Sequence, residues 1–84
     1  MEYYLTPAAL RDLEKLPHDI RKRIYHKLNF YTRQPAPLIF ARQLTNEVAG
    51  KFRLRVGDYR IIFNVVKNKM IVHAIGHRRD IYKK

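Results

Sequence analysis

Residues 51–64 bring together side chains that could bind a phosphodiester and help to cleave it. Polar and apolar residues alternate up to Val56, the pair Gly57-Asp58 follows, and a second β-rich run begins at Tyr59. This pattern predicts a β-hairpin with a two-residue turn. Its apolar face would carry Phe52, Leu54, Val56, Tyr59, Ile61 and Phe63. Its other face, here called the cationic face, would carry Lys51, Arg53, Arg55, Arg60, Ile62 and Asn64.

The cationic face predicts an anionic ligand. The hairpin register places Arg55 directly opposite Arg60, and like charges in that position destabilise a sheet unless something offsets them. A phosphate backbone is the obvious candidate, because guanidinium forks match phosphate oxygens. Basic hairpin faces also occur in RNA-binding proteins that cleave nothing. A binding module therefore stands beside the nuclease as an alternative.

Cleavage of RNA would need few additional groups. The RNA strand carries its own nucleophile, the 2′-hydroxyl, so a protein need only position it, stabilise charge and move protons. Arginine stays protonated and transfers protons poorly. The groups left for acid or base work are Lys51, His73, His77 and Tyr82. The sequence does not choose the general base among them.

Other reaction classes lack their residues. The seven acidic residues are scattered without carboxylate spacing for a metal pair, serine is absent, and no glycine-rich loop precedes a helix. Two-metal nuclease chemistry, a Ser-His-Asp hydrolase and a nucleotide cofactor are therefore not expected. We expect no metal and no small-molecule cofactor.

Length and charge set the broad class. The 84 residues predict a single domain, 1–84, with 18 Lys and Arg against 7 Asp and Glu and a formal net charge of +11. Such a charge favours a polyanionic partner, and nucleic acid or an acidic protein fits better than a membrane surface. The absence of cysteine, of a long apolar run and of a signal peptide predicts a cytoplasmic protein without a membrane segment.

The remaining elements predict an α+β fold. A short strand at 3–5 precedes Thr6-Pro7, a favourable helix start. The first helix would bury Leu10, Leu13 and Leu16, and the second Ile20, Ile24, Leu28 and Tyr31. Residues 32–50 read as a connection, and residues 70–75 as a third long strand. The order β-α-α-β-β-β predicts two helices packed on the apolar face of a mainly antiparallel sheet.

The turn at 67–69 leaves two registers for that last strand. A two-residue loop would place Val72 and Ala74 on the apolar face, and His73, Ile75 and His77 on the cationic face. A three-residue loop would reverse these faces. We prefer the two-residue loop, because Val72 and Ala74 then join the apolar face.

Two stretches resemble the RelE/ParE superfamily of bacterial and archaeal toxins, and most of all the RelE-type mRNA interferases. They are residues 52–63 (FRLRVGDYRIIF) and residues 75–82 (IGHRRDIY), and residues 16–21 (LPHDIR) are also similar. The resemblance covers nearly the whole chain. It implies a metal-independent endoribonuclease that cuts mRNA on the ribosome and forms a 2′,3′-cyclic phosphate. It also implies a cognate antitoxin that is acidic in its binding segment.

The resemblance assigns roles to individual residues. Arg60 would contact the scissile phosphate, Arg78 would stabilise charge or assist the leaving group, and Tyr82 would stack on or orient a base. Arg53 completes the catalytic set, and the expected RNA-binding residues are Lys51, Arg55, His77 and Arg79. Lys51 and Arg53 stand where the best-studied members carry two lysines, and the segment from Arg78 to Tyr82 is shorter here. The ParE branch, which shares the fold and poisons DNA gyrase without these catalytic residues, is the alternative.

Overall fold

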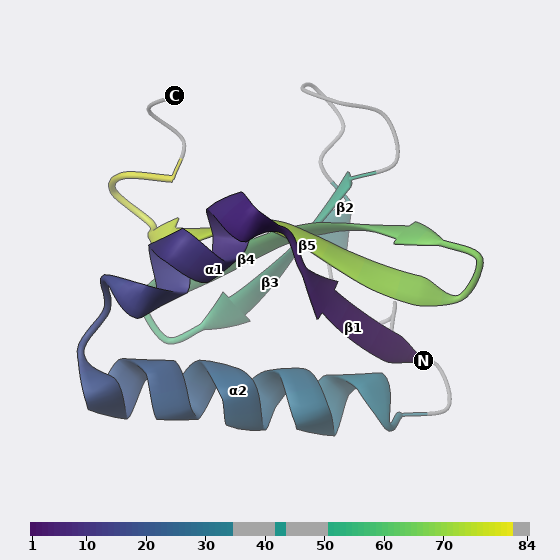
Figure 1. The fold of residues 1–84 in the computed structure, drawn as a ribbon, viewed down its shortest axis with the longest axis horizontal. Coiled ribbons are helices and arrows are strands. Elements are labelled where there is room, and N and C mark those ends of the chain that lie inside the picture. Colours follow the sequence, from purple (N-terminus) through teal and green to yellow (C-terminus); the bar gives the residue numbers. More distant parts are fainter. Residues whose placement is uncertain (35–41, 44–50, 82–84) are drawn as a thin grey trace.

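The computed structural model describes residues 1–34, 42–43 and 51–81, which form two helices and a five-stranded sheet. The elements are β1 (Glu2–Leu5), α1 (Pro7–Glu14), α2 (His18–Thr32), β2 (Arg42–Gln43), β3 (Lys51–Val56), β4 (Tyr59–Val66) and β5 (Lys69–His77). The strand order is β1-β5-β4-β3-β2 (Figure 1). Only β1 and β5 pair in parallel. The predicted α+β fold is confirmed, and β2 is an added strand within the predicted connection.

Both helices contribute to one core on the same face of the sheet. The hydroxyl of Thr6 accepts a hydrogen bond from the Ala9 amide at 3.1 Å, and Pro7 opens α1 as predicted. Ala9 and Leu13 are buried, whereas Leu10 is 42% exposed. The prediction that Leu10 belongs to the core was wrong, because residues 9 and 13, four apart, define the buried stripe of α1.

The longer helix, α2, runs along the sheet (Figure 1), and its Tyr31 contributes to an aromatic core. Ile24, Leu28 and Tyr31 are buried as predicted. The Tyr31 ring meets Phe63 edge-on at a centroid distance of 5.9 Å, and Phe52 stacks on Phe63 at 5.5 Å. This aromatic cluster holds the apolar face of the β3–β4 hairpin against α2 and leaves the cationic face on the other side of the sheet.

The β3–β4 hairpin has the predicted register. Val56 pairs with Tyr59, Arg55 with Arg60, and Lys51 with Asn64. Gly57 adopts a φ of +60°, which a residue without a side chain reaches at little cost. The two-residue turn and the alternation of the strands therefore fix which side chains share the cationic face.

The second hairpin contains a β-bulge that the sequence did not reveal. Its two-residue loop, Lys67-Asn68, has positive φ angles of 49° and 62°, so the preferred loop length is confirmed. Phe63 then pairs with Val72, but Ile62 pairs with Ala74, which leaves His73 as an extra residue in β5.

The bulge changes the face of every residue that follows it. Val72 lies in the core as predicted, but Ala74 stands opposite Ile62 of the cationic face. Ile75 pairs with Ile61 and is 4% exposed in the core. The predicted faces of Ala74 and Ile75 were therefore wrong, because one inserted residue shifts the alternation by one.

Helix α1 supplies a hydrogen-bond acceptor to β5 past the point where β5 stops pairing with β1. The pairing of β1 with β5 ends at Leu5 and Val72, and the Thr6 amide still donates to the Val72 carbonyl at 3.0 Å. Further along, the Ile75 amide donates to Oδ2 of Asp12 at 3.1 Å. A carboxylate from α1 thus replaces a neighbouring strand just after the bulge.

We expect the Asp12→Ala variant to lower the free energy of unfolding by about 1–3 kcal/mol, because the partly buried Ile75 amide loses its acceptor. Asp12→Asn retains a side-chain oxygen and should lose less. Urea unfolding of both variants measures the difference. Equal stability of Asp12→Ala and the wild type would show that the carboxylate does not hold the edge of β5.

Candidate nucleic-acid interface

The cationic face consists of three rows of residues across β3, β4 and β5. The row next to the β3–β4 turn is Arg55, Arg60 and Gly76; the middle row is Arg53, Ile62 and Ala74; the far row is Lys51, Asn64 and Ile71, with His73 beside Asn64. Successive rows on one face lie about 7 Å apart along a strand. A phosphate placed over the middle row would therefore have cations in the rows on both sides.

Arg60 is more buried than the sequence suggested. Its side chain is 8% exposed, and its Nη1 donates to the carbonyls of Gly57 at 2.9 Å and Tyr59 at 3.0 Å. Two helices on the apolar face would leave the cationic face uncovered, but at Arg60 it is not, because the guanidinium folds onto the turn. This arrangement also relieves the opposition to Arg55, which stays exposed. The pairing of two arginines is therefore no longer evidence by itself for a bound anion.

Two further arginines converge on the same turn. The Arg78 amide donates to the Asp58 carbonyl at 2.8 Å, and Nε of Arg78 lies 3.7 Å from Oδ1 of Asp58. From α2, Nη2 of Arg23 lies so close to Gly57 that an added Cβ would meet it at 3.0 Å. Arg23, Arg60 and Arg78 are called the turn cluster below. The Arg78 side chain is 57% exposed, so its weak ion pair leaves it accessible to a phosphate.

His73 gains a defined position from the bulge. Its Nε2 lies 2.6 Å from Oδ1 of Asn64 on the cationic face. Partial burial, followed by the positive charge of Lys51, lowers the pKa of His73 below its usual value of 6.5. The lowered pKa favours the neutral imidazole at pH 7. In the tautomer whose Nε2 donates to the Asn64 amide oxygen, Nδ1 keeps its lone pair.

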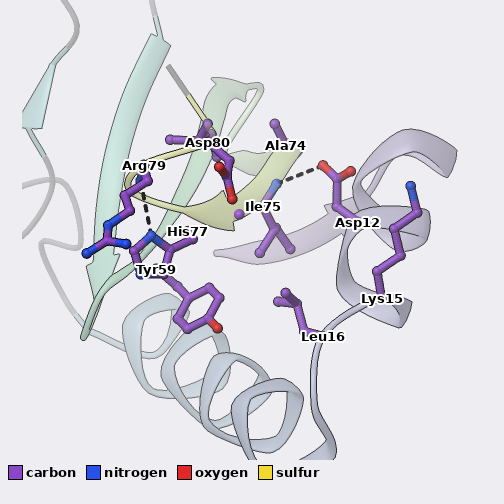
Figure 2. Close-up of a pocket in the computed structure, with 11 residues that line it drawn as sticks. Asp12, Lys15, Leu16, Tyr59, Ala74, Ile75, His77, Arg79 and Asp80 are labelled. Carbon is purple, nitrogen blue, oxygen red and sulfur yellow. Dashed lines mark hydrogen bonds between the residues drawn. The ribbon is translucent and has the colours of Figure 1, made fainter. Parts of the chain in front are cut away.

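His77 and Arg79 lie on the helix side of the sheet. They line a cavity of about 570 Å³ whose other walls include Asp12, Lys15 and Tyr59 (Figure 2). The His77 ring meets Tyr59 edge-on at 5.4 Å, and its Nδ1 accepts from the Arg79 amide at 3.1 Å. The prediction that His77 shares the cationic face with Arg55 was wrong, and the bulge at His73 is the reason.

The other residues selected from the sequence have mixed outcomes. Lys51 and Arg53 are partly buried members of β3, and Arg55 is exposed. Tyr82 lies outside the described residues. Within the described part of the chain, no group of three or more His, Cys, Asp or Glu side chains is arranged to hold a metal ion. None of the described helices is long and apolar enough to cross a membrane.

Sequence reasoning did not select two contributors to these surfaces, Asp12 on α1 and Arg23 on α2. His73 was among the four candidates for acid or base work, but its place in a bulge was not expected. The sequence held one usable signal. Gly57 at the hairpin turn permits a close approach that any side chain would hinder.

Comparison with known proteins gives a consistent family. The family model for the ParE toxin of the type II toxin–antitoxin system parDE matches residues 3–82. Toxin RelG of Mycobacterium tuberculosis is 32% identical over 81 residues, which span 94% of this chain and 92% of that protein.

Solved structures agree in fold. A chain in the crystal structure of the toxin–antitoxin complex RelBE2 from Mycobacterium tuberculosis is 29% identical, with a TM-score of 0.79 over 92% of this chain and 96% of that one. A chain in the RelB–RelE antitoxin–toxin complex from Methanococcus jannaschii is 25% identical, with a TM-score of 0.72 over 93% of both chains. The isolated RelE toxin of E. coli shares the fold at 18% identity, with a TM-score of 0.72 over 90% of this chain and 82% of that one. The chain therefore belongs to the RelE/ParE family and is a toxin of a type II toxin–antitoxin system.

Proposed function

We propose that this toxin is a ribosome-dependent endoribonuclease that cleaves mRNA during translation in the cytoplasm. The observation that carries the proposal is a neutral, oriented histidine on a face otherwise dominated by cations. His73 lies beside Lys51 and Asn64 of the far row, and Arg53 stands in the middle row. Arg60 of the turn cluster stands in the row at the other end of the same face. This combination supplies a proton acceptor and charge stabilisation for the 2′-hydroxyl chemistry of RNA.

In the proposed reaction, the 2′-hydroxyl oxygen attacks the adjacent phosphorus and the bond from phosphorus to the 5′-oxygen breaks. Nδ1 of His73 accepts the proton of the 2′-hydroxyl, the leaving 5′-oxygen takes a proton from water, and the products are a 2′,3′-cyclic phosphate and a 5′-hydroxyl. The phosphate lies over the middle row, between the far row beside His73 and the row of Arg55 and Arg60, and these two outer rows are about 13 Å apart along the strands. Arg53 and Arg78 bind the phosphate oxygens, whose negative charge increases in the transition state.

Arg60 has a double task in this proposal. Both of its hydrogen bonds to the turn use Nη1. A guanidinium carries five donors on three nitrogens, so the same side chain can hold the turn and offer other donors to a phosphate. A lysine at this position could not do both with the same geometry.

We also propose a cognate antitoxin as protein partner. The solved relatives from Mycobacterium tuberculosis and Methanococcus jannaschii are described as toxin–antitoxin complexes. With a net charge of +11, this chain favours an antitoxin that is acidic in the segment that binds it.

A gyrase poison remains the second candidate, because the matching family model is that of the ParE toxin. Induced expression followed by primer extension on a translated message separates the two. Cuts within codons support the nuclease. Intact message accompanied by inhibition of DNA supercoiling supports the gyrase poison and would overturn the proposal.

We expect Arg78→Ala to lower the single-turnover cleavage rate on programmed ribosomes by about 10²–10³, the usual loss when a charge-stabilising donor is removed. Its free energy of unfolding should change by less than about 0.5 kcal/mol, because the ion pair with Asp58 is exposed. Arg11→Ala, which removes an exposed charge from α1, is the matched control and should cleave like the wild type. Wild-type cleavage by Arg78→Ala would make this arginine structural.

Arg60→Ala should behave differently from Arg78→Ala. It should also lose cleavage, but we expect the free energy of unfolding to fall by about 1.5–3 kcal/mol, because a buried charged donor to two turn carbonyls is removed. Urea unfolding beside the cleavage assay measures both effects. Unchanged stability would show that the contacts of Nη1 do not hold the turn.

The pH dependence tests the role of His73. A base works when deprotonated, so the cleavage rate should fall only as the pH drops through the folded-state pKa of His73, which lies below 6.5. Lys51→Gln removes a charge that lowers this pKa and should move the acidic limb to higher pH, whereas the distant Lys69→Gln should not. His73→Gln should abolish that limb and lower the rate by about 10²–10⁴. An unaltered limb in His73→Gln would assign the base to another group.

A further inference from the structure

A second cationic surface lies between α2 and the end of β3, next to the cationic face. It is a groove of about 600 Å³ lined by Asp19, Lys22, Arg23, His26, Lys27, Arg55, Val56 and Gly57. Lys22, Arg23 and Lys27 belong to α2 and Arg55 to β3, so both walls carry positive charge. Among the described residues of this lining, Asp19 is the only one with a carboxylate.

We propose that this groove binds the phosphate backbone of a second RNA segment, distinct from the strand that is cleaved. The inference rests on the proposed function only in naming RNA as the ligand. The groove itself follows from the packing of α2 against the β3–β4 turn. Its cations would hold the toxin on structured RNA while the cationic face engages the message.

Arg55 makes the two surfaces continuous. It is an exposed member of the first row of the cationic face, and it also lines the groove. Arg23 links them a second time, because it lines the groove and packs against Gly57 of the turn. The positive surface therefore passes around the end of β3, and a polyanion that follows it meets charge without interruption.

The chemistry of the lining favours RNA over an acidic protein. Protein interfaces depend on apolar and aromatic anchors that fill a desolvated centre. Among the lining residues that the structure describes, Val56 is the only branched aliphatic one, and it is 8% exposed. Phosphates need only point charges from lysine and forks from arginine, and both walls of the groove supply them.

The test uses the double variant Lys22→Gln/Lys27→Gln. Arg23 and Arg55 are left in place, because one packs on Gly57 and the other belongs to the cationic face. The probe is a short blunt-ended RNA duplex without a cleavable single strand, and its affinity is measured at several salt concentrations. Two lost phosphate contacts should make the slope of log K against log salt shallower by about 1.4–1.8.

The control carries the same change of charge elsewhere. Arg11→Gln/Lys69→Gln removes one cation from α1 and one from the start of β5, and its salt slope should match the wild type. An equal slope for the Lys22/Lys27 variant and the wild type would overturn the inference. So would a loss of binding to polyglutamate with no loss of binding to the duplex, because that result identifies an acidic protein as the occupant.

The experiment separates this inference from the proposed function. Duplex binding needs no cleavage. If the wild type cleaves nothing but the Lys22→Gln/Lys27→Gln variant has the shallower slope, the groove inference stands and the nuclease proposal fails. If the wild type cleaves ribosome-bound mRNA and the variant has an unchanged slope, the nuclease proposal stands and the groove inference fails.

Discussion

The two-residue turn at Gly57-Asp58 is the constraint on which the other features depend. Its positive φ at Gly57 and the pairing of Val56 with Tyr59 fix the register of the β3–β4 hairpin. A shift of one residue would send the cations into the core and the aromatic residues into solvent. The turn also receives Arg60 from its own strand, Arg78 from the end of β5 and Arg23 from α2. This tight turn thus determines which hairpin residues enter the core and which form the cationic face, and the turn cluster gathers around it.

The bulge at His73 determines which residues of β5 face the core, as the turn does for the β3–β4 hairpin. By adding one residue it returns Ile75 to the core and keeps His73 on the cationic face beside Asn64. Without it, strict alternation from Val72 would place Ile75 among the cations. The bulge also presents the Ile75 amide to Asp12 of α1. Bulges often aim a side chain near a functional site, and here that side chain is His73, whose pKa is lowered by partial burial and by Lys51.

The sequence predicted what alternation and turn chemistry determine. The fold class, the hairpin register, the helix start at Thr6 and the two-residue loop at Lys67-Asn68 follow from local patterns, and the structure has all of them. It did not predict the bulge, because an inserted strand residue leaves the apolar pattern of β5 ambiguous. The burial of Arg60 depends on which carbonyls the folded turn presents. The groove depends on how α2 lies against β3. The burial of Arg60 and the groove both depend on tertiary contacts, which the spacing of residues along the chain does not predict.

The central claim is that this chain cleaves mRNA only where a ribosome presents it. The most direct measurement compares one mRNA in two samples, free and bound in programmed ribosomes. The ribosomes are assembled and crosslinked first, and excess EDTA is then added to both samples. Purified toxin is added to each sample, and the 3′ ends of the RNA are mapped. The account predicts cuts in the ribosome-bound message alone, at codon positions, with 2′,3′-cyclic phosphate ends. An intact message in both samples, or equal cutting of the free RNA, would contradict it.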